Sequence, residues 1–242
     1  MVSWRPVLGA IAAFGALGFL GLLFGMKDPV RSVPGEHSGS AMQNISMLFN
    51  RKLLAGALVT VLAYAGSFTA YTFIAPILMQ VTGVTGATVS LFMLVYGITA
   101  AVGNILGGKL TDSMGVNRAN ILIISGIVIV VLGMWLLASS PASMGILVAL
   151  LGMLTFAAVP ALQARLIGVA EQHAPHAHGV AAGLNIAGFN SGIALGSVLG
   201  GLTITHAGIV YTGISGAIVS LLGLLLLLAQ IRRCHSSKFQ QA

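Results

Sequence analysis

Long stretches without a charged residue constrain this chain more than any other feature of its sequence. Four such stretches cover residues 6–26, 53–108, 119–164 and 172–231. A helix that crosses a bilayer needs about 20 apolar residues, because the hydrocarbon layer is about 30 Å thick and a helix rises about 1.5 Å per residue. The first stretch therefore has room for one crossing, and each of the other three has room for two.

Each of the three long stretches is interrupted near its middle by turn-forming and polar residues. The interruptions are QVTGVTGATVS at 80–90, SSPAS at 139–143 and THAG at 205–208, and such residues favour turns and loops. The sequence thus predicts an all-α integral membrane protein with one single helix and three helical hairpins. We expect the seven spans at about residues 7–26, 53–79, 90–108, 119–138, 143–165, 178–203 and 209–231.

The composition agrees with a membrane location and argues against other classes. Hydrophobic residues make up 57% of the chain and charged residues 6%, and the mean hydropathy is +1.01, unlike a soluble domain. The net charge of +7 is scattered between apolar runs, whereas a nucleic-acid partner needs a basic face. We expect a lipid bilayer as partner and no nucleic acid. The single cysteine, Cys234, excludes an internal disulfide and a cysteine-based metal site.

The basic residues predict how the chain is oriented. Because each hairpin returns to the side where it starts, segments 27–52, 109–118, 165–177 and 232–242 share one face. Ten of the 11 Lys and Arg residues lie in these segments, and Arg5 alone lies opposite. Positively charged loops stay in the cytoplasm, so this face and the C-terminus are expected to be cytoplasmic.

These boundaries also predict the organisation of the chain. We expect a lone transmembrane helix at 1–26, a cytoplasmic linker at 27–52, a six-helix unit at 53–231 and a cytoplasmic tail at 232–242. A cleaved signal peptide is disfavoured, because the first apolar run is followed by GMKDPVRS and not by a small-residue cleavage site.

No Asp, Glu, Lys or Arg lies inside a predicted span, which removes several functions. The chain alone cannot form a carboxylate proton relay, a retinal Schiff base or the nucleophile–base pair of an intramembrane hydrolase. We therefore expect neither an enzyme nor a cofactor. His173, His176 and His178 lie in a short predicted loop without the closed ligand set of a structural zinc site. We expect no metal there and place these histidines at the headgroup boundary.

Aromatic and hydroxyl side chains recur on one face of the second predicted span. Tyr64, Ser67, Phe68 and Tyr71 follow the spacing i, i+3, i+4 and i+7, and Pro76 kinks or ends the helix beyond them. This face either lines a cavity for an amphiphilic or aromatic ligand or packs between helices.

Further polar residues inside the spans are candidates for the same cavity. Tyr96 and Asn104 lie two turns apart on the third span, and Asn185 and Asn190 lie on the sixth. Each can line the cavity or bond between helices. For Gln163 on the fifth span an interfacial position is favoured over a ligand-facing one.

Glycines recur every four residues along the sixth predicted span, at Gly188, Gly192, Gly196 and Gly200. This spacing strips one helical face of side chains, so that a neighbouring backbone can approach closely. The span is thus predicted to pack closely, or to rock, against another helix.

Six helices with charges pooled at one end, preceded by a long linker, resemble the C-terminal half of a major facilitator superfamily transporter. The stretch GGKLTDSMGVNR at 107–118 is similar to the cytoplasmic loop signature of that family. Ser113 and Val116 depart from it, since basic residues are usual there. The matching positions are Gly107, Gly108, Asp112, Gly115 and Arg118.

The resemblance implies a gating loop made by Gly108, Lys109, Asp112, Gly115 and Arg118. Asp112 would accept hydrogen bonds from the N-terminus of a neighbouring helix, whose dipole favours an anion. The two basic residues would anchor the loop to lipid headgroups.

YTFIAP and GLNIAGFNSGIALG resemble the sugar-efflux and drug-efflux branch, which includes arabinose efflux permease relatives, and MVSWRP resembles the approach to the sixth helix of the twelve-helix fold. The resemblance implies a C-terminal portion holding helices six to twelve, whose partner is the missing N-terminal half. It also implies efflux of sugars, drugs or other small amphiphiles by proton antiport across a bacterial inner membrane.

Two alternatives remain open at this point. One is a seven-helix receptor or structural membrane protein, although the missing intramembrane lysine and the lack of a receptor-like charged triplet disfavour a receptor. The other is an inactive truncated product.

Overall fold

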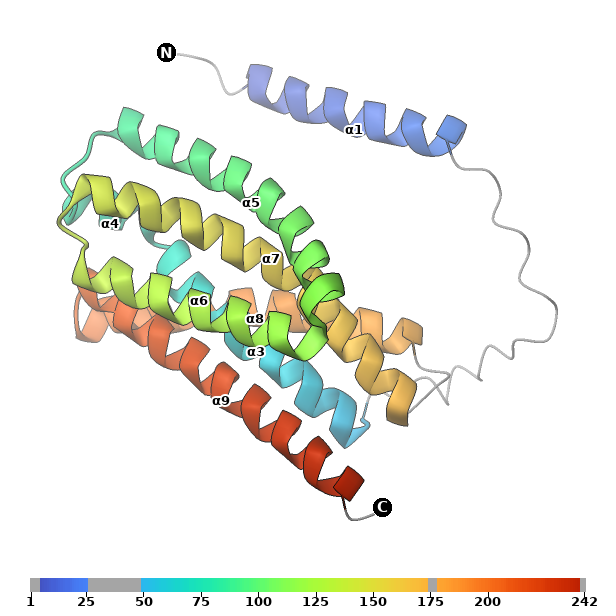
Figure 1. The fold of residues 1–242 in the computed structure, drawn as a ribbon. Coiled ribbons are helices and arrows are strands. Elements are labelled where there is room, and N and C mark those ends of the chain that lie inside the picture. The colour runs from blue at the N-terminus through green and yellow to red at the C-terminus, as the bar shows by residue number, and fades with distance from the viewer. Residues whose placement is uncertain (1–4, 26–48, 174–177, 240–242) are drawn as a thin grey trace. The chain divides into compact units, whose positions relative to one another are not determined.

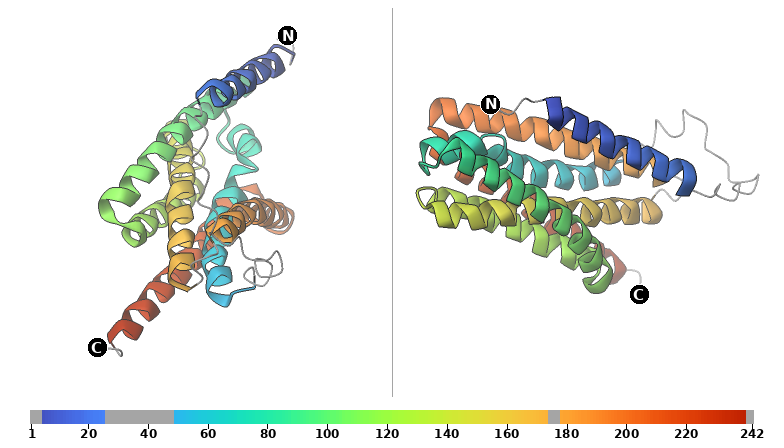
Figure 2. Two further views of the ribbon diagram at one scale, coloured as in Figure 1. Left: turned by 90° about the vertical axis from the view of Figure 1, so that its right-hand side faces the viewer. Right: turned by 90° about the horizontal axis from the view of Figure 1, so that it is seen from above.

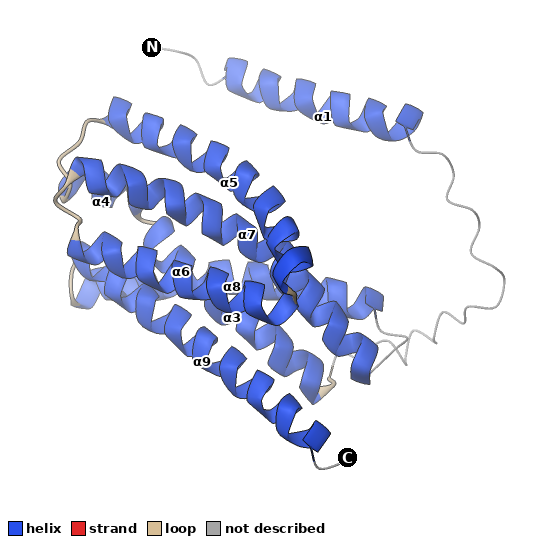
Figure 3. Ribbon diagram, in the orientation of Figure 1, coloured by secondary structure: helices blue, strands red, loops and turns tan. Residues whose placement is uncertain are grey.

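The computed structural model describes residues 5–25, 49–173 and 178–239, without the side chains of 173 and 234–239. Within these ranges every regular element is a helix (Figures 1 and 3). Seven segments of the described chain are long and apolar enough to cross a membrane. The predicted fold class, all-α with seven spans, is confirmed. Most of the predicted linker lies outside the described residues.

Helix α1 (Arg5–Gly25) belongs to one unit of the chain, and the remaining helices belong to another. Its sequence, RPVLGAIAAFGALGFLGLLFG, carries no charge after Arg5. The predicted first span, 7–26, agrees with this helix to within two residues at its start and one at its end.

The second unit is a bundle of long helices that run roughly along a common direction (Figure 2). A 3-10 turn, Ile209–Tyr211, precedes the last helix. The α-helices are α3 (Arg51–Tyr71), α4 (Ile74–Gln80), α5 (Gly86–Met114), α6 (Val116–Leu136), α7 (Pro141–His173), α8 (His178–His206) and α9 (Thr212–Phe239).

A capping side chain explains where the second span begins, and a proline explains where its helix breaks. The side chain of Asn50 caps α3 by accepting the backbone N–H of Lys52 at 2.9 Å. The helix then breaks at Thr72 and Phe73 before α4 begins. Pro76 explains the break, because proline has no N–H and its ring clashes with the carbonyl four residues earlier.

The predicted loop at 109–118 is wrong, because this segment is helical on both sides of a single residue. Helix α5 runs through Met114 and α6 begins at Val116. Only Gly115 separates them, with a φ of 83° that favours glycine. Lys109 and Asp112 therefore lie on the last turns of α5, and Arg118 lies on the first turn of α6.

Three further helices extend beyond the predicted spans at one end. Helix α7 continues to His173, α9 continues to Phe239 and α3 begins at Arg51, inside the predicted linker. Charged residues mark where a segment meets water, but lysine, arginine and glutamate are good helix formers. The helices therefore extend past the apolar runs into the predicted loops and tail.

Within the bundle, α3 and α7 contact each other and each packs on further helices. Helix α7 packs on α5 and α6, while α3 packs on α8 and α9, and α6 closes the bundle against α9. The core between them contains fully buried side chains such as Val59, Ile124, Leu151, Leu162 and Leu227.

The glycines of α8 lie against the backbone of α3. An added Cβ would lie 2.7 Å from the carbonyl oxygen of Val61 at Gly192 and 2.5 Å from that of Ala65 at Gly196. At Gly200 it would lie 2.6 Å from that of Thr69, whereas Gly188 leaves 3.4 Å to that of Ala57. Three positions of the predicted stripe thus have no room for a side chain.

A second pair of glycines joins α5 to α7. A Cβ at Gly103 or Gly107 would collide with the backbone carbonyl of Met153 or Ala157. Gly107, which belongs to the loop signature, is therefore a helix-packing residue in this fold. Sequence reasoning missed this contact, although the four-residue spacing of the two glycines is the usual signal for it.

Arg165 does not lie in a loop, and this prediction is corrected. The side chain is 7% exposed within α7, and its Nη2 donates to Oε1 of Gln230 on α9 at 2.5 Å. Nε2 of Gln230 in turn donates to the carbonyl oxygen of Ala55 on α3 at 2.8 Å. The arginine therefore lies inside the bundle, near the end where α3 begins and α9 ends.

Candidate functional site

Aromatic rings from four helices form a continuous row inside the bundle. Neighbouring ring centroids lie 4.4 to 6.3 Å apart, within the range of favourable aromatic pairs. In order along the row, which we call the aromatic row, the residues are Phe189, Tyr64, Phe68, Tyr71, Tyr96 and Phe156.

The rings of the row differ in burial, and the ring at one end is exposed. Tyr64 and Tyr96 are 5% and 6% exposed, Phe68 and Tyr71 are half-buried, and Phe156 is 37% exposed. Helical spacing on α3 predicted three of these rings, whereas Phe156 and Phe189 join from α7 and α8. Their contribution was missed because contacts between distant helices leave no periodic signal in one segment.

The hydroxyl groups around the row differ in their hydrogen-bond partners. Tyr64 donates from Oη to the carbonyl oxygen of Thr155 at 3.0 Å. In contrast, Tyr96 Oη and Thr155 Oγ1 are buried and have no hydrogen-bond partner within the described chain. Buried polar atoms are normally paired, so these two hydroxyl groups are unsatisfied polar groups next to the row. Ser67 is buried and bonds the carbonyl oxygen of Ala63 on its own helix at 3.2 Å.

A hydrogen-bond chain of one hydroxyl and two amides joins three helices, about one helical turn before Tyr64 on α3 and before Phe189 on α8. Thr60 on α3 donates to Oδ1 of Asn185 on α8 at 2.8 Å. Nδ2 of Asn185 donates to Oε1 of Gln163 on α7 at 2.6 Å. Asn185 is completely buried, so this amide chain ties three helices together across the bundle interior.

Two predicted cavity residues do not join this interior site. Asn104 is exposed on α5, while Tyr96 on the same helix is buried. Asn190 is also exposed, and its Nδ2 donates to the carbonyl oxygen of Ile186 on its own helix at 2.9 Å. The structure therefore brings Tyr64, Phe68 and Tyr71 together with Tyr96 and separates these two asparagines from them.

The charged residues near the α5–α6 junction face outward. Lys109, Asp112 and Arg118 are all exposed, as is Gly115, whereas Gly108 is half-buried. Their exposure leaves them open to a partner outside this bundle.

Of the three histidines between residues 173 and 178, the structure describes the side chain of His178, at the start of α8. Nε2 of His178 lies 3.8 Å from Oε1 of Glu171. His176 and the side chain of His173 lie outside the described residues. Among the residues that are described, no three His, Cys, Asp or Glu side chains gather as a metal site would require.

Long apolar helices around an interior of aromatic rings and amides define this chain as an all-helical membrane protein. The chain belongs to the Major Facilitator Superfamily, whose family model matches residues 1–174.

Relatives from several bacteria support this membership. The MFS-type transporter YtbD of Bacillus subtilis (strain 168) is 33% identical over 90% of this chain and 54% of its own length. The inner membrane transport protein YdhP of Escherichia coli (strain K12) is 32% identical over 96% of this chain and 58% of its own.

A relative from Helicobacter acinonychis (strain Sheeba), named "Probable sugar efflux transporter", is 28% identical over 93% of this chain and 55% of its own length. The chain thus spans little more than half the length of these curated relatives.

Proposed function

We propose that this chain forms one half of the substrate cavity of an efflux transporter for sugars, drugs or other small amphiphiles, driven by proton antiport. Transporters of this superfamily bind substrate between two related six-helix halves. The sugar-efflux name of one relative supports an outward direction and a small polar substrate. The chain covers about half of the length of its relatives, and the resemblance of residues 107–118 to the loop signature favours the C-terminal half.

The observation that carries this proposal is the aromatic row with its two unpaired hydroxyls. Aromatic faces stack on sugar rings and planar groups, while Tyr96 Oη and Thr155 Oγ1 offer hydrogen bonds to a ligand hydroxyl. No acidic or basic residue belongs to the row, so it favours substrates that are uncharged where they touch it. This matches the pattern of apolar walls with few polar groups in small-molecule sites.

Binding of a fluorescent neutral glycoside, 4-methylumbelliferyl glucoside, tests the proposal on the chain in lipid nanodiscs. Tyr96→Phe removes one unpaired hydroxyl, and Phe156→Ala removes the exposed end of the row. Each should weaken binding about threefold to tenfold, as expected for one lost hydrogen bond or ring contact.

Tyr211→Phe is the matched control, because Tyr211 is exposed in the 3-10 turn and lies outside the row. Binding should be unchanged in this variant. Equal affinity of all three variants and the original chain, or no binding in any of them, would contradict a substrate site at the aromatic row.

The gating role belongs to the same proposal. The α5–α6 junction, with Gly108, Lys109, Asp112, Gly115 and Arg118, is proposed to face the cytoplasm in a bacterial inner membrane. There Asp112 would accept hydrogen bonds from a helix N-terminus of the other half. The exposure of Asp112 and of both basic side chains supports this role.

A further inference from the structure

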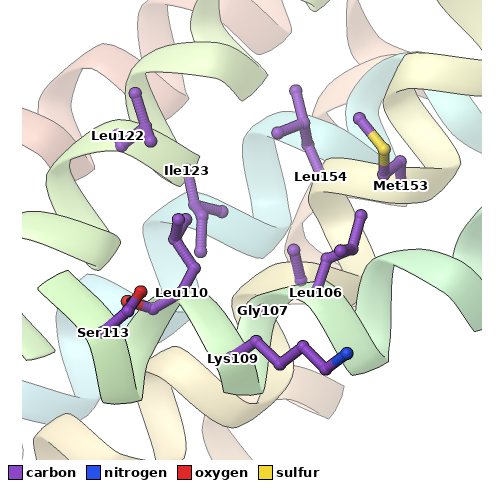
Figure 4. Close-up of a pocket in the computed structure, with 10 residues that line it drawn as sticks. Leu106, Gly107, Lys109, Leu110, Ser113, Leu122, Ile123, Met153 and Leu154 are labelled. Carbon is purple, nitrogen blue, oxygen red and sulfur yellow. Dashed lines mark hydrogen bonds between the residues drawn. The ribbon is translucent and has the colours of Figure 1, made fainter.

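An apolar groove opens between α5 and α6, outside the aromatic row. It has a volume of about 390 Å³, and its walls include Leu106 and Leu110 of α5, Leu122 of α6, and Met153 and Leu154 of α7 (Figure 4). Helices α5 and α6 each pack more extensively on α7 than on one another. The groove is the gap that this arrangement leaves near their junction.

Small residues allow the groove to reach α7. Gly107 and Ala157 both line it, and the backbone of α7 lies directly against Gly107. The outer wall is open, because Leu106 and Leu122 are 46% and 51% exposed. An elongated apolar group can therefore enter the groove from the side of the bundle.

Two polar side chains lie at one edge of this groove. Lys109 and Ser113 are one helical turn apart on α5, both are exposed, and both line the groove beside Leu106 and Leu110 (Figure 4). No acidic side chain lines the groove. Its polar edge therefore carries a single positive charge, which complements a phosphate group. The Ser113 hydroxyl beside it donates to the carbonyl oxygen of Leu110 at 3.3 Å.

The position of Lys109 along α5 agrees with a headgroup depth. It lies five residues before the end of α5, where the charge-free run of the sequence has just ended. From there the groove extends back along α5 to Leu106 and across to Met153, within the apolar spans. A cation at the end of an apolar groove between helices matches a lipid with an anionic head.

We propose that the groove between α5 and α6 binds an anionic phospholipid, with one acyl chain against Leu106, Leu122 and Leu154 and the phosphate held by Lys109. This site is separate from the aromatic row and does not depend on the proposed transport function. Charge complementarity favours an anionic lipid over a neutral amphiphile, which would not use the lysine, and a second copy of the chain is an outcome of the test below.

Native mass spectrometry of the detergent-purified chain, titrated with phosphatidylglycerol or phosphatidylcholine, tests the head contact. Lys109→Gln should weaken the tightest phosphatidylglycerol binding at least fivefold and leave phosphatidylcholine binding unchanged. Lys52→Gln is the matched control, because Lys52 is an exposed lysine at the start of α3 and does not line the groove. Equal losses in the two variants would overturn the proposal.

Occupation of the groove is tested by a larger side chain at its open wall. Leu106→Trp should weaken binding of both lipids, whereas Leu94→Trp, at a 60% exposed position outside the groove on the same helix, should not. Loss of a dimer in the Leu106→Trp variant would assign the groove to a second copy of the chain and overturn the proposal. Glycerophosphate that competes as well as the intact lipid would also overturn it. If Leu106→Trp does not fold, the effect of Lys109→Gln on lipid binding still tests the proposal.

Discussion

Tyr64 and Tyr96 occupy the same aromatic row, but only one of them has its hydroxyl paired. Tyr64 Oη bonds the carbonyl oxygen of Thr155, while Tyr96 Oη is buried without a partner in the described chain. Tyr64→Phe should therefore lower the free energy of unfolding by about 0.5–1.5 kcal/mol. Tyr96→Phe should leave it unchanged or raise it, because a buried unpaired hydroxyl is costly.

Thermal unfolding of both variants in one detergent measures this difference. A larger loss for Tyr96→Phe than for Tyr64→Phe would show that the Tyr96 hydroxyl has a structural partner. In that case weaker glycoside binding by Tyr96→Phe could not be assigned to the ligand.

Asn185 and Asn190 provide a second comparison between single residues. Asn185 links α3 and α7 through Thr60 and Gln163, whereas Asn190 bonds only its own helix and is exposed. Asn185→Leu should cost about 1–2 kcal/mol, the range of buried interhelical hydrogen bonds in membranes. Asn190→Leu should cost less than about 0.5 kcal/mol. Unfolding in urea measures both, and equal losses would mean that the amide chain does not stabilise the bundle.

The sequence predicted some of the candidate site and missed the rest for a physical reason. Tyr64, Phe68 and Tyr71 share a face by helical periodicity alone, and the structure places them together. The partners Thr155, Phe156 and Phe189 come from other helices, and which helices become neighbours is decided by packing. Arg165 was assigned to a loop because charge suggests water, yet Gln230 and Ala55 lie within reach of its end of α7.

At the scale of helices, the glycine stripe of α8 predicts a sharp difference between neighbouring positions. Gly192→Leu and Gly196→Leu should each destabilise the bundle by about 1–3 kcal/mol, because the α3 backbone lies where the side chain would go. Ala194→Leu is the control, since Ala194 lies on the exposed face of the same helix.

Folded protein recovered from membranes, measured by size-exclusion chromatography, tests this prediction. Equal yields of the three variants would show that α8 can move away from α3 at little cost. A static interface and a rocking one both predict the loss, so this measurement tests close packing only.

Helix number was easier to predict from the sequence than helix ends. Charge-free runs set the number of spans because the bilayer fixes their length. The helix ends depend on backbone hydrogen bonding outside the bilayer, where a helix can continue without apolar side chains. Helix α5 therefore passes Lys109 and Asp112 without a break and ends only at Gly115, whose φ of 83° is incompatible with a continuing helix.

At the scale of the whole molecule, the orientation in the membrane is a testable prediction. Ser113 is exposed at the α5–α6 junction, and Ser139 is exposed in the turn between α6 and α7, at the other end of α6. In a Cys234→Ser background, Ser113→Cys should resist an impermeant thiol reagent applied to intact cells, while Ser139→Cys should react. The reverse pattern would invert the proposed topology.

Proton coupling depends on which groups in the whole chain can exchange a proton inside the membrane. Of the four acidic residues, Asp28 and Glu36 lie outside the described residues. Asp112 and Glu171 are exposed on the last turns of α5 and α7. Arg165 is buried, but an arginine keeps its proton at any physiological pH. No carboxylate is therefore placed inside a described span, where a proton antiporter needs one.

We predict from this distribution that the 242-residue chain in liposomes moves no protons in response to substrate. A pH-sensitive dye inside the vesicles measures the flux, and a protonophore added at the end shows that the vesicles were sealed. Co-reconstitution with an N-terminal six-helix partner should permit coupling, because that half can supply both the carboxylate and the second wall of the cavity. Saturable, gradient-dependent flux from the chain alone would contradict the proposed half-site and make this bundle, as a monomer or a homodimer, sufficient for transport.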